Sequence, residues 1–138
     1  MTVVGGRDAM IGGMAPMLRE GRFVFCTAAD LSRFEGRAIG MFREDEGWSA
    51  ILPIADAEAL GFGSHAPMRQ ITLQVFSALG GVGLTAAVAG ALAEAGIACN
   101  MVAAFHHDHA FVPAAAADRA LVVLQRLQSG IVDAPATF

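Results

Sequence analysis

QITLQVFSALGGVGLTAAVAGALAEAGIACNMVAAFHHDHAFVP, residues 70–113, carries the clearest structural pattern in the chain. It begins with a strict alternation of polar and apolar residues over 70–76, which predicts a half-buried strand whose polar side faces water or a partner. A glycine turn at 80–83 then leads into an alanine-rich helix that ends at a glycine. Residues 97–105 predict a second strand, and a histidine-rich turn connects it to a third strand over 109–112.

The last part of the chain predicts one more helix but no clear strand. Pro113 stands at the first-turn position of this helix, and Gly130 is expected just past its end. The second half therefore reads β-α-β-β-α, which is most of the split ferredoxin-like pattern. Pro135 interrupts the remaining residues 131–138, so we expect a strand of the first half, or another chain, to complete the open sheet edge.

The first half predicts two helices and three strands of its own. Apolar residues over 10–18 recur at helical spacing, and residues 22–28 are apolar on both faces, as in a covered central strand. Residues 37–44 and 48–54 are expected to pair across a short acidic turn. A short helix over 56–60 follows.

A segment rich in glycine, serine and proline, residues 63–69, predicts a linker between two units. The expected units are residues 1–62 and residues 70–138. The predicted fold is therefore α+β, with two side-by-side ferredoxin-like βαββαβ units that have antiparallel sheets.

Composition limits the classes of function. The chain has 138 residues, of which 55% are hydrophobic and 16% are charged, so it is long enough for two small folded units but not for a large modular enzyme. The net charge is -4, and all nine basic residues are scattered arginines. A nucleic-acid or anionic-membrane surface needs a concentrated positive field, so we expect neither partner. The apolar excess and the incomplete sheet predict a homo-oligomer.

The cysteines and the apolar segments indicate a cytoplasmic protein. Cys26 and Cys99 each lie in an apolar stretch, which favours buried reduced thiols over a disulfide. No unbroken apolar segment near the N-terminus predicts a signal peptide. Residues 76–93 contain four glycines and two hydroxyl residues, and we interpret them as a loop and a buried helix instead of a membrane span.

The glycine turn is the first candidate site. Gly81, Gly83 and Ala86 match the G-x-G-x-x-A dinucleotide fingerprint. The chain is too short for a full Rossmann sheet, however, and no acidic residue ends the next strand. Absence of lysine excludes a Walker P-loop. Two interpretations remain: a helix N-terminus that binds a carboxylate, or an ordinary tight turn.

The histidine cluster is the second candidate site. His106, His107 and His109 surround Asp108, a set that suggests a divalent metal. Alternate residues of a strand point to opposite faces, so at most two of these side chains should converge unless the turn is unusual. A solvated hairpin tip is therefore the favoured interpretation. No adjacent base activates either cysteine and no serine lies in a G-x-S-x-G elbow, so the sequence predicts no catalytic set.

The second half resembles an ACT domain. The resemblance rests first on the initial strand, the turn closed by Gly83-Leu84-Thr85 and the alanine-rich helix. It rests also on the segment AGIACN, residues 95–100, and on the hairpin that follows it, with Asp108 before Phe111-Val112. The first half resembles the leading half of small bacterial tandem-ACT proteins, and CASTOR-type arginine sensors have the same order of pieces. The resemblance implies two ACT-like units packed side by side.

The resemblance also implies where a ligand would bind. In amino-acid-binding members of the family, the effector lies against the glycine turn and the helix start. When the family motif is matched to this sequence, the residues expected to bind the carboxylate of the effector are Gly81, Val82, Gly83, Leu84 and Thr85. Asp108 is then the partner of a cationic group, since a fixed carboxylate binds an ammonium or guanidinium. No cofactor is implied.

Three functions follow as expectations. The first is an amino-acid-binding regulatory protein without catalytic activity, which reports a free amino acid to a partner. The second is a metal-assisted or cofactor-free enzyme on a dimeric ferredoxin-like sheet that uses the cluster His106 to His109. The third is an interaction module that has lost its ligand.

Overall fold

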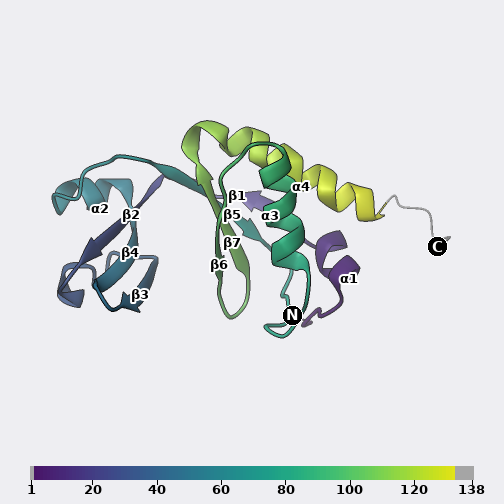
Figure 1. Ribbon diagram of the computed structural model, residues 1–138, viewed down its shortest axis with the longest axis horizontal. Coiled ribbons are helices and arrows are strands. Elements are labelled where there is room, and N and C mark those ends of the chain that lie inside the picture. Colours follow the sequence, from purple (N-terminus) through teal and green to yellow (C-terminus); the bar gives the residue numbers. More distant parts are fainter. Residues whose placement is uncertain (1, 133–138) are drawn as a thin grey trace.

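The computed structural model describes residues 2–132, whose strands join in one antiparallel sheet with the helices on one side (Figure 1). The strands are β1 (Pro16–Leu18), β2 (Phe23–Ala28), β3 (Gly40–Glu44), β4 (Gly47–Pro53), β5 (Met68–Leu73), β6 (Asn100–Ala103) and β7 (Asp108–Pro113). The helices are α1 (Arg7–Gly12), α2 (Ile54–Ala59), α3 (Leu84–Glu94) and α4 (Ala117–Val132), with 3-10 turns η1 (Leu31–Arg33) and η2 (Ala114–Ala116).

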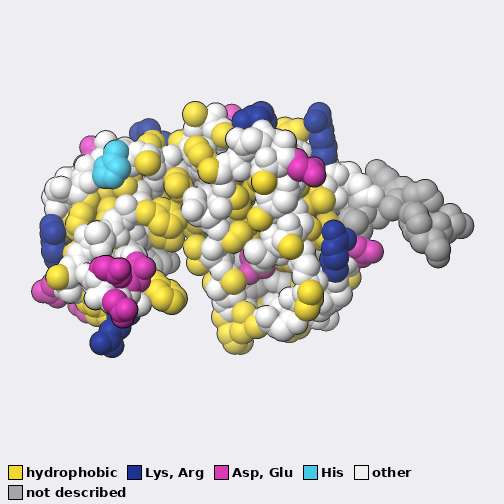
Figure 2. All heavy atoms as spheres, in the orientation of Figure 1, with side chains coloured by type: hydrophobic (Ala, Val, Ile, Leu, Met, Phe, Trp, Pro, Cys, Tyr) yellow, Lys and Arg dark blue, Asp and Glu magenta, His cyan; other side chains and the backbone are white. Residues whose placement is uncertain are grey.

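The sheet consists of two halves that meet at a narrow junction. Its strand order is β3-β4-β2-β5-β7-β6, and β1 also pairs with β5. We call β3, β4 and β2 the N-terminal half-sheet and β1, β5, β7 and β6 the C-terminal half-sheet. The only register pair between β2 and β5 is Phe23 with Met68. Because so few backbone bonds join the halves, the sheet bends there, and Figure 2 shows the molecule hollowed between them.

The open edge of the C-terminal half-sheet is completed from within the chain. β1 pairs antiparallel with β5, with Pro16 opposite Leu73 and Leu18 opposite Ile71. The expectation that a strand of the first half fills this edge is confirmed. Residues 131 and 132 end α4 instead of starting a strand, and residues 133–138 lie outside the described part of the chain.

The helix predicted over 10–18 is wrong beyond its first turn. α1 ends at Gly12, and the next residues bend until Ala15 takes a φ of 44° and β1 begins at Pro16. Met10 is buried in the core as predicted, whereas Met17 is on a strand and 38% exposed. The two consecutive glycines disfavour the helix, and pairing with β5 then decides the conformation of the residues that follow.

Two further boundaries differ from the prediction. The strand expected over 97–105 is only β6, because the Ile97 amide returns to the carbonyl of Leu92 and closes the end of α3. Gly130 lies inside α4 and not after it. A glycine costs about 1 kcal/mol in a helix relative to alanine, which the packing of the preceding turns of α4 outweighs.

The remaining predicted elements occur within a few residues of their expected positions. The β3–β4 hairpin, α2, β5 and β7 all form, and β5 already begins at Met68, inside the predicted linker. Along β5, Ile71 and Leu73 face the helices as expected. Thr72, expected to face water or a partner, is only 1% exposed, because Arg19 and His109 cover and hydrogen-bond it.

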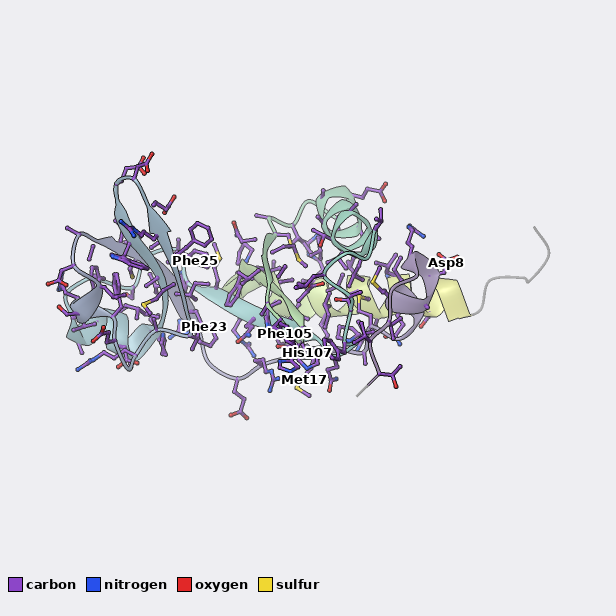
Figure 3. The ribbon with its side chains drawn as sticks, turned by 90° about the horizontal axis from the view of Figure 1, so that it is seen from below. Asp8, Met17, Phe23, Phe25, Phe105 and His107 are labelled. Carbon is purple, nitrogen blue, oxygen red and sulfur yellow. The ribbon has the colours of Figure 1, made fainter. Side chains whose placement is uncertain are left out.

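The N-terminal half-sheet contacts the C-terminal one through aromatic rings on the helix-free face. Phe23 and Phe25 both meet the Phe111 ring edge-on, with centroid separations of 5.9 and 5.6 Å. Figure 3 shows Phe23 and Phe25 on the side of the N-terminal strands that faces the second half. These contacts hold the two half-sheets at an angle to each other.

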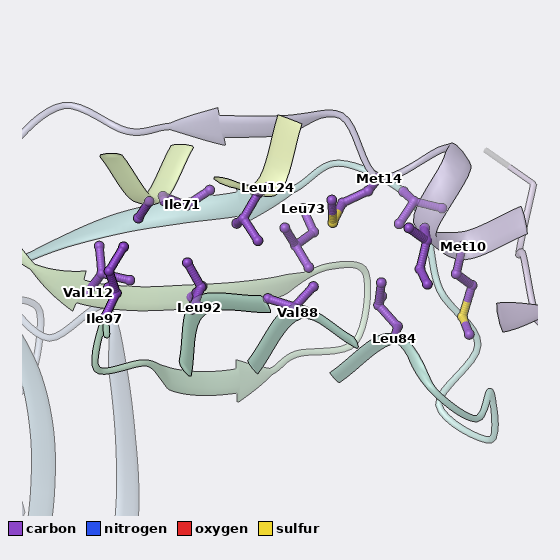
Figure 4. Close-up of a cluster of buried hydrophobic side chains, with 14 of the residues drawn as sticks. Met10, Met14, Ile71, Leu73, Leu84, Val88, Leu92, Ile97, Val112 and Leu124 are labelled. Carbon is purple, nitrogen blue, oxygen red and sulfur yellow. The ribbon is translucent and has the colours of Figure 1, made fainter. Parts of the chain in front are cut away.

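The main core lies between the C-terminal half-sheet and helices α1, α3 and α4. Figure 4 shows Leu84, Val88 and Leu92 of α3 directed at the strand residues Ile71 and Leu73. A smaller core under α2 contains Val24, Phe34, Ala50, Leu52 and Ala57. None of the helices between residues 2 and 132 has the length and apolar character needed to cross a membrane.

Candidate functional site

The glycine turn places an uncapped helix start beside β7. Gly83 is the N-cap of α3, has a φ of 109°, and provides no side chain to bind the amides of the first helical turn. The corresponding position of the short turn η1 differs, because the Asp30 carboxylate accepts a hydrogen bond of 2.9 Å from the Ser32 amide. The starts of α1 and α2 also lack a side-chain cap. At α3 the first-turn amides, which carry partial positive charge, have no side-chain acceptor in the described structure.

A cavity of about 120 Å³, which we call the turn pocket, lies at this helix start. It brings together five of the six residues that the resemblance implies: Gly81, Gly83, Leu84, Thr85 and Asp108. Val82, the sixth, does not line it, and its side chain is 81% exposed. Sequence reasoning missed the other lining residues, which are Met10, Ser77, Ala78, Leu79 and Ala103.

Asp108 supplies a buried carboxylate to the turn pocket. It is the first residue of β7, is 8% exposed, and accepts a hydrogen bond of 3.1 Å from the Ser77 hydroxyl at Oδ2. Neither of the two ion pairs found among residues 2–132 involves it. A buried carboxylate without a cationic partner attracts one, so the pocket has an acidic side and a side of amide donors.

The N-terminal segment closes one side of the pocket. Val4 forms a parallel bridge with Ser77, and α1 then lies over the turn. A Cβ atom on Gly83 would come within 2.9 Å of the Arg7 side chain, and one on Gly81 within 2.9 Å of Met10 Sδ. A side chain at either position would therefore displace a side chain of α1, and the positive φ of Gly83 itself favours glycine. Ser77, directly after the alternating strand, is the one missed residue that the sequence could have indicated.

The three imidazoles of the histidine cluster have different partners. The centroid of the His106 ring lies 5.3 Å from the centroid of the Phe76 ring. His107 Nδ1 is 3.3 Å from the Val75 carbonyl oxygen. His109 Nδ1 is 3.0 Å from Thr72 Oγ1. Between residues 2 and 132 no group of three or more His, Cys, Asp or Glu side chains could hold a metal ion. Burial, reinforced by the positive charges of His107 and Arg19, lowers the pKa of His109, and Asp108 opposes this.

Both thiols are free in the described structure. Cys26 and Cys99 are half-buried, and burial raises the pKa of each thiol. Since only the thiolate is a strong nucleophile, both side chains are poorly reactive at neutral pH.

Two family models match adjacent parts of this chain. Residues 8–69 match one ACT-domain model, and residues 66–126 match another. The chain belongs to the ACT-domain family. The tandem ACT arrangement and the α+β fold predicted from the sequence are both confirmed.

Solved structures support the assignment of this tandem ACT protein. A protein of unknown function from Vibrio cholerae, described as a possible transport protein, is 41% identical, with a TM-score of 0.77, and the match covers 85% of this chain and 92% of that one. The regulatory subunit of aspartate kinase from Thermus thermophilus, in a ligand-free form, is 10% identical, with a TM-score of 0.63 and coverages of 83% and 97%. At that identity the likeness concerns the fold alone. Among curated proteins, none matches this sequence.

The two family matches overlap within the predicted linker. They share residues 66–69, which include the start of β5. Placing the boundary between units 1–62 and 70–138 stays a prediction, as does the likeness to the CASTOR-type arginine sensors.

Proposed function

We propose that this tandem ACT protein binds a free amino acid in the turn pocket and acts as a regulatory protein without catalytic activity. The observation that carries the proposal is the pairing of an uncapped start of α3 with the buried Asp108 carboxylate around one cavity. An α-amino acid has a carboxylate for the amides and an ammonium group for Asp108. The two sides of the pocket are complementary to the two charged groups that every free amino acid carries.

The volume of the pocket favours a small side chain. Its volume of about 120 Å³ is smaller than that of a cavity of about 150 Å³ that holds one benzene molecule. Met10 and Leu84 form apolar walls, so there is no counter-charge for a second ionised group. We therefore expect glycine, alanine or serine to bind before leucine, arginine or phenylalanine.

The proposal also covers the oligomeric state of the protein and its location in the cell. The helix-free face and the sheet edge at β3 expose Phe25, Met41 and Phe42, at 41%, 44% and 73%. Burying such apolar side chains favours association, so we propose a homo-oligomer. We further propose a cytoplasmic protein whose two units are residues 1–62 and 70–138, and whose amino-acid occupancy is reported to a protein partner.

Isothermal titration of the full chain against each of the twenty amino acids tests the proposal. We expect saturable binding of at least one small amino acid, and at least about tenfold weaker binding in the Asp108→Asn variant. Asp118→Asn is the matched control, since Asp118 is exposed in the first turn of α4. Absence of binding by all twenty amino acids to the folded wild-type protein would contradict the proposal.

A further inference from the structure

A second and larger cavity lies on the opposite side of the sheet from the turn pocket. It has a volume of about 460 Å³ and lies where the helix-free faces of the two half-sheets bend toward each other. We call it the inter-sheet cleft. Arg19, Gln70 and His109 line its polar end, and Ile51, Val102 and Phe111 line its apolar part. The proposed function does not involve these side chains.

The cleft is held open by the way the half-sheets contact each other. Phe23 and Phe25 pack against Phe111 at the junction, and this contact fixes the angle between the sheets. Away from the junction the two half-sheets do not contact each other across the cleft. Apolar side chains on the N-terminal side of the cleft remain exposed, for example Ile39 at 49%. An apolar guest would remove this surface from water, which is favourable.

The polar end of the cleft is organised by a hydrogen-bond network. Arg19 Nε donates to Thr72 Oγ1 at 3.0 Å, and Thr72 Oγ1 lies 3.0 Å from His109 Nδ1. The Gln70 amide nitrogen is also 3.0 Å from His109 Nδ1. The Gln70 amide nitrogen can only donate, so in this arrangement His109 Nδ1 is its acceptor. Thr72 is 1% exposed and anchors the network from inside the fold, whereas Arg19 is exposed and Gln70 and His109 are half-buried.

The network orients a guanidinium group without neutralising it. Arg19 uses Nε for Thr72, and neither of the two ion pairs found among residues 2–132 involves its side chain. The two terminal nitrogens of Arg19 therefore remain as donors beside the cleft. A planar guanidinium with free donors favours a carboxylate. Glu20, which also lines the cleft, disfavours a guest with several negative charges.

We propose that the inter-sheet cleft is a second ligand site, which takes a small organic monocarboxylate with a compact apolar group. The carboxylate pairs with Arg19, and the apolar group packs between Ile51, Val102 and Phe111. A volume of about 460 Å³ is within the range of about 300–1,000 Å³ that is typical of small-molecule sites. Glu20 also fits the ammonium group of an apolar amino acid, so the ligand has two chemical sources, with or without an α-amino group.

Titration calorimetry with 3-phenylpropanoate, phenylalanine and 3-phenylpropanamide tests the proposal on the full chain. We expect a carboxylate probe to bind, and the uncharged amide to bind at least about tenfold more weakly. Arg19→Gln should weaken carboxylate binding by at least about tenfold. Arg22→Gln is the matched control, because Arg22 is exposed and does not line the cleft. Tighter binding of phenylalanine would identify an amino acid as the ligand, and tighter binding of 3-phenylpropanoate would identify a carboxylate without an α-amino group. Both results support the site.

A second variant fills the cleft without removing a charge. Val102→Phe places a larger side chain on the helix-free face and should abolish binding while circular dichroism stays unchanged. Asp108→Asn, in the turn pocket, should leave binding of 3-phenylpropanoate intact, so failure of one site is distinguishable from failure of the other. The proposal is overturned if neither carboxylate binds the wild-type protein at millimolar concentration, or if Arg19→Gln and Val102→Phe both bind like the wild type.

Discussion

Asp108 and His109 are neighbours in β7, but their side chains lie on opposite faces of the sheet. Asp108 faces the start of α3 and accepts a hydrogen bond from Ser77, whereas His109 faces the inter-sheet cleft and contacts Thr72. Successive residues of a strand alternate in direction, so one short strand supplies a polar group to each of two separate cavities. The turn pocket and the cleft can therefore be altered independently.

Replacing Asp108 by asparagine tests the acidic side of the turn pocket. The amide keeps the size of the side chain and can still accept from Ser77, but it loses the charge that would bind an ammonium group. We expect the affinity for the bound amino acid to fall by at least about tenfold, in line with about 1.5–3 kcal/mol for a charge-assisted hydrogen bond. Calorimetry measures this, and unchanged affinity would assign the ammonium group elsewhere.

Two glycine substitutions in and before α3 should have opposite effects on stability. Gly83 has a positive φ, and an added Cβ would come within 2.9 Å of Arg7, so Gly83→Ala should lower the free energy of unfolding by about 1–3 kcal/mol. Gly90 lies inside the helix with no atom within 4 Å of an added Cβ, so Gly90→Ala should raise it by about 0.5–1 kcal/mol. Urea denaturation of both variants provides the comparison, and a stabilising Gly83→Ala would contradict the description of the turn.

The lowered pKa of His109 predicts a dependence of stability on pH. The unfolded ring has a pKa of about 6.5, so between that value and the lower pKa of the folded state the unfolded chain binds more protons. The contribution of His109 is therefore complete above about pH 6.5 and is lost as the pH falls through the pKa of the folded state. We expect the urea midpoint to fall between about pH 7.5 and pH 5, and to fall less in His109→Gln.

His65→Gln is the control for this pH dependence. His65 is exposed in the loop before β5, so its replacement should leave the dependence of the wild-type protein in place. If His109→Gln and the wild type lose equal stability over the same range, His109 is not the group responsible.

Slow modification of both cysteines is a further expectation. Burial raises the pKa of the Cys26 and Cys99 thiols, so the reactive thiolate is scarce at neutral pH and access is restricted. Reaction with a chromogenic disulfide reagent should be several-fold slower in the native protein than in urea. Native rates equal to those in urea would show that β2 around Cys26 and the segment before β6 around Cys99 open readily.

Local pattern was sufficient to predict most elements, and the family resemblance implied part of the lining of the turn pocket. The alternation before Phe76 predicted β5, and the residues after Gly83 predicted α3, because the spacing of apolar side chains reports directly on a strand or a helix. Five of the residues expected around a ligand do line one cavity, since the turn and the hairpin follow each other in a regular ferredoxin-like order.

By itself the sequence determined which segments are strands and helices wherever the apolar period was unbroken, and it determined the alternating faces of β7. Only the tertiary structure decided that residues 16–18 form a strand, that Met10 closes the turn pocket and that Arg19 donates to Thr72 at the polar end of the inter-sheet cleft. The physical reason is range: the apolar period of a segment depends on residues a few positions apart, whereas these contacts join residues that are 50 or more positions apart. They form only when the N-terminal segment packs on β5 and on the glycine turn.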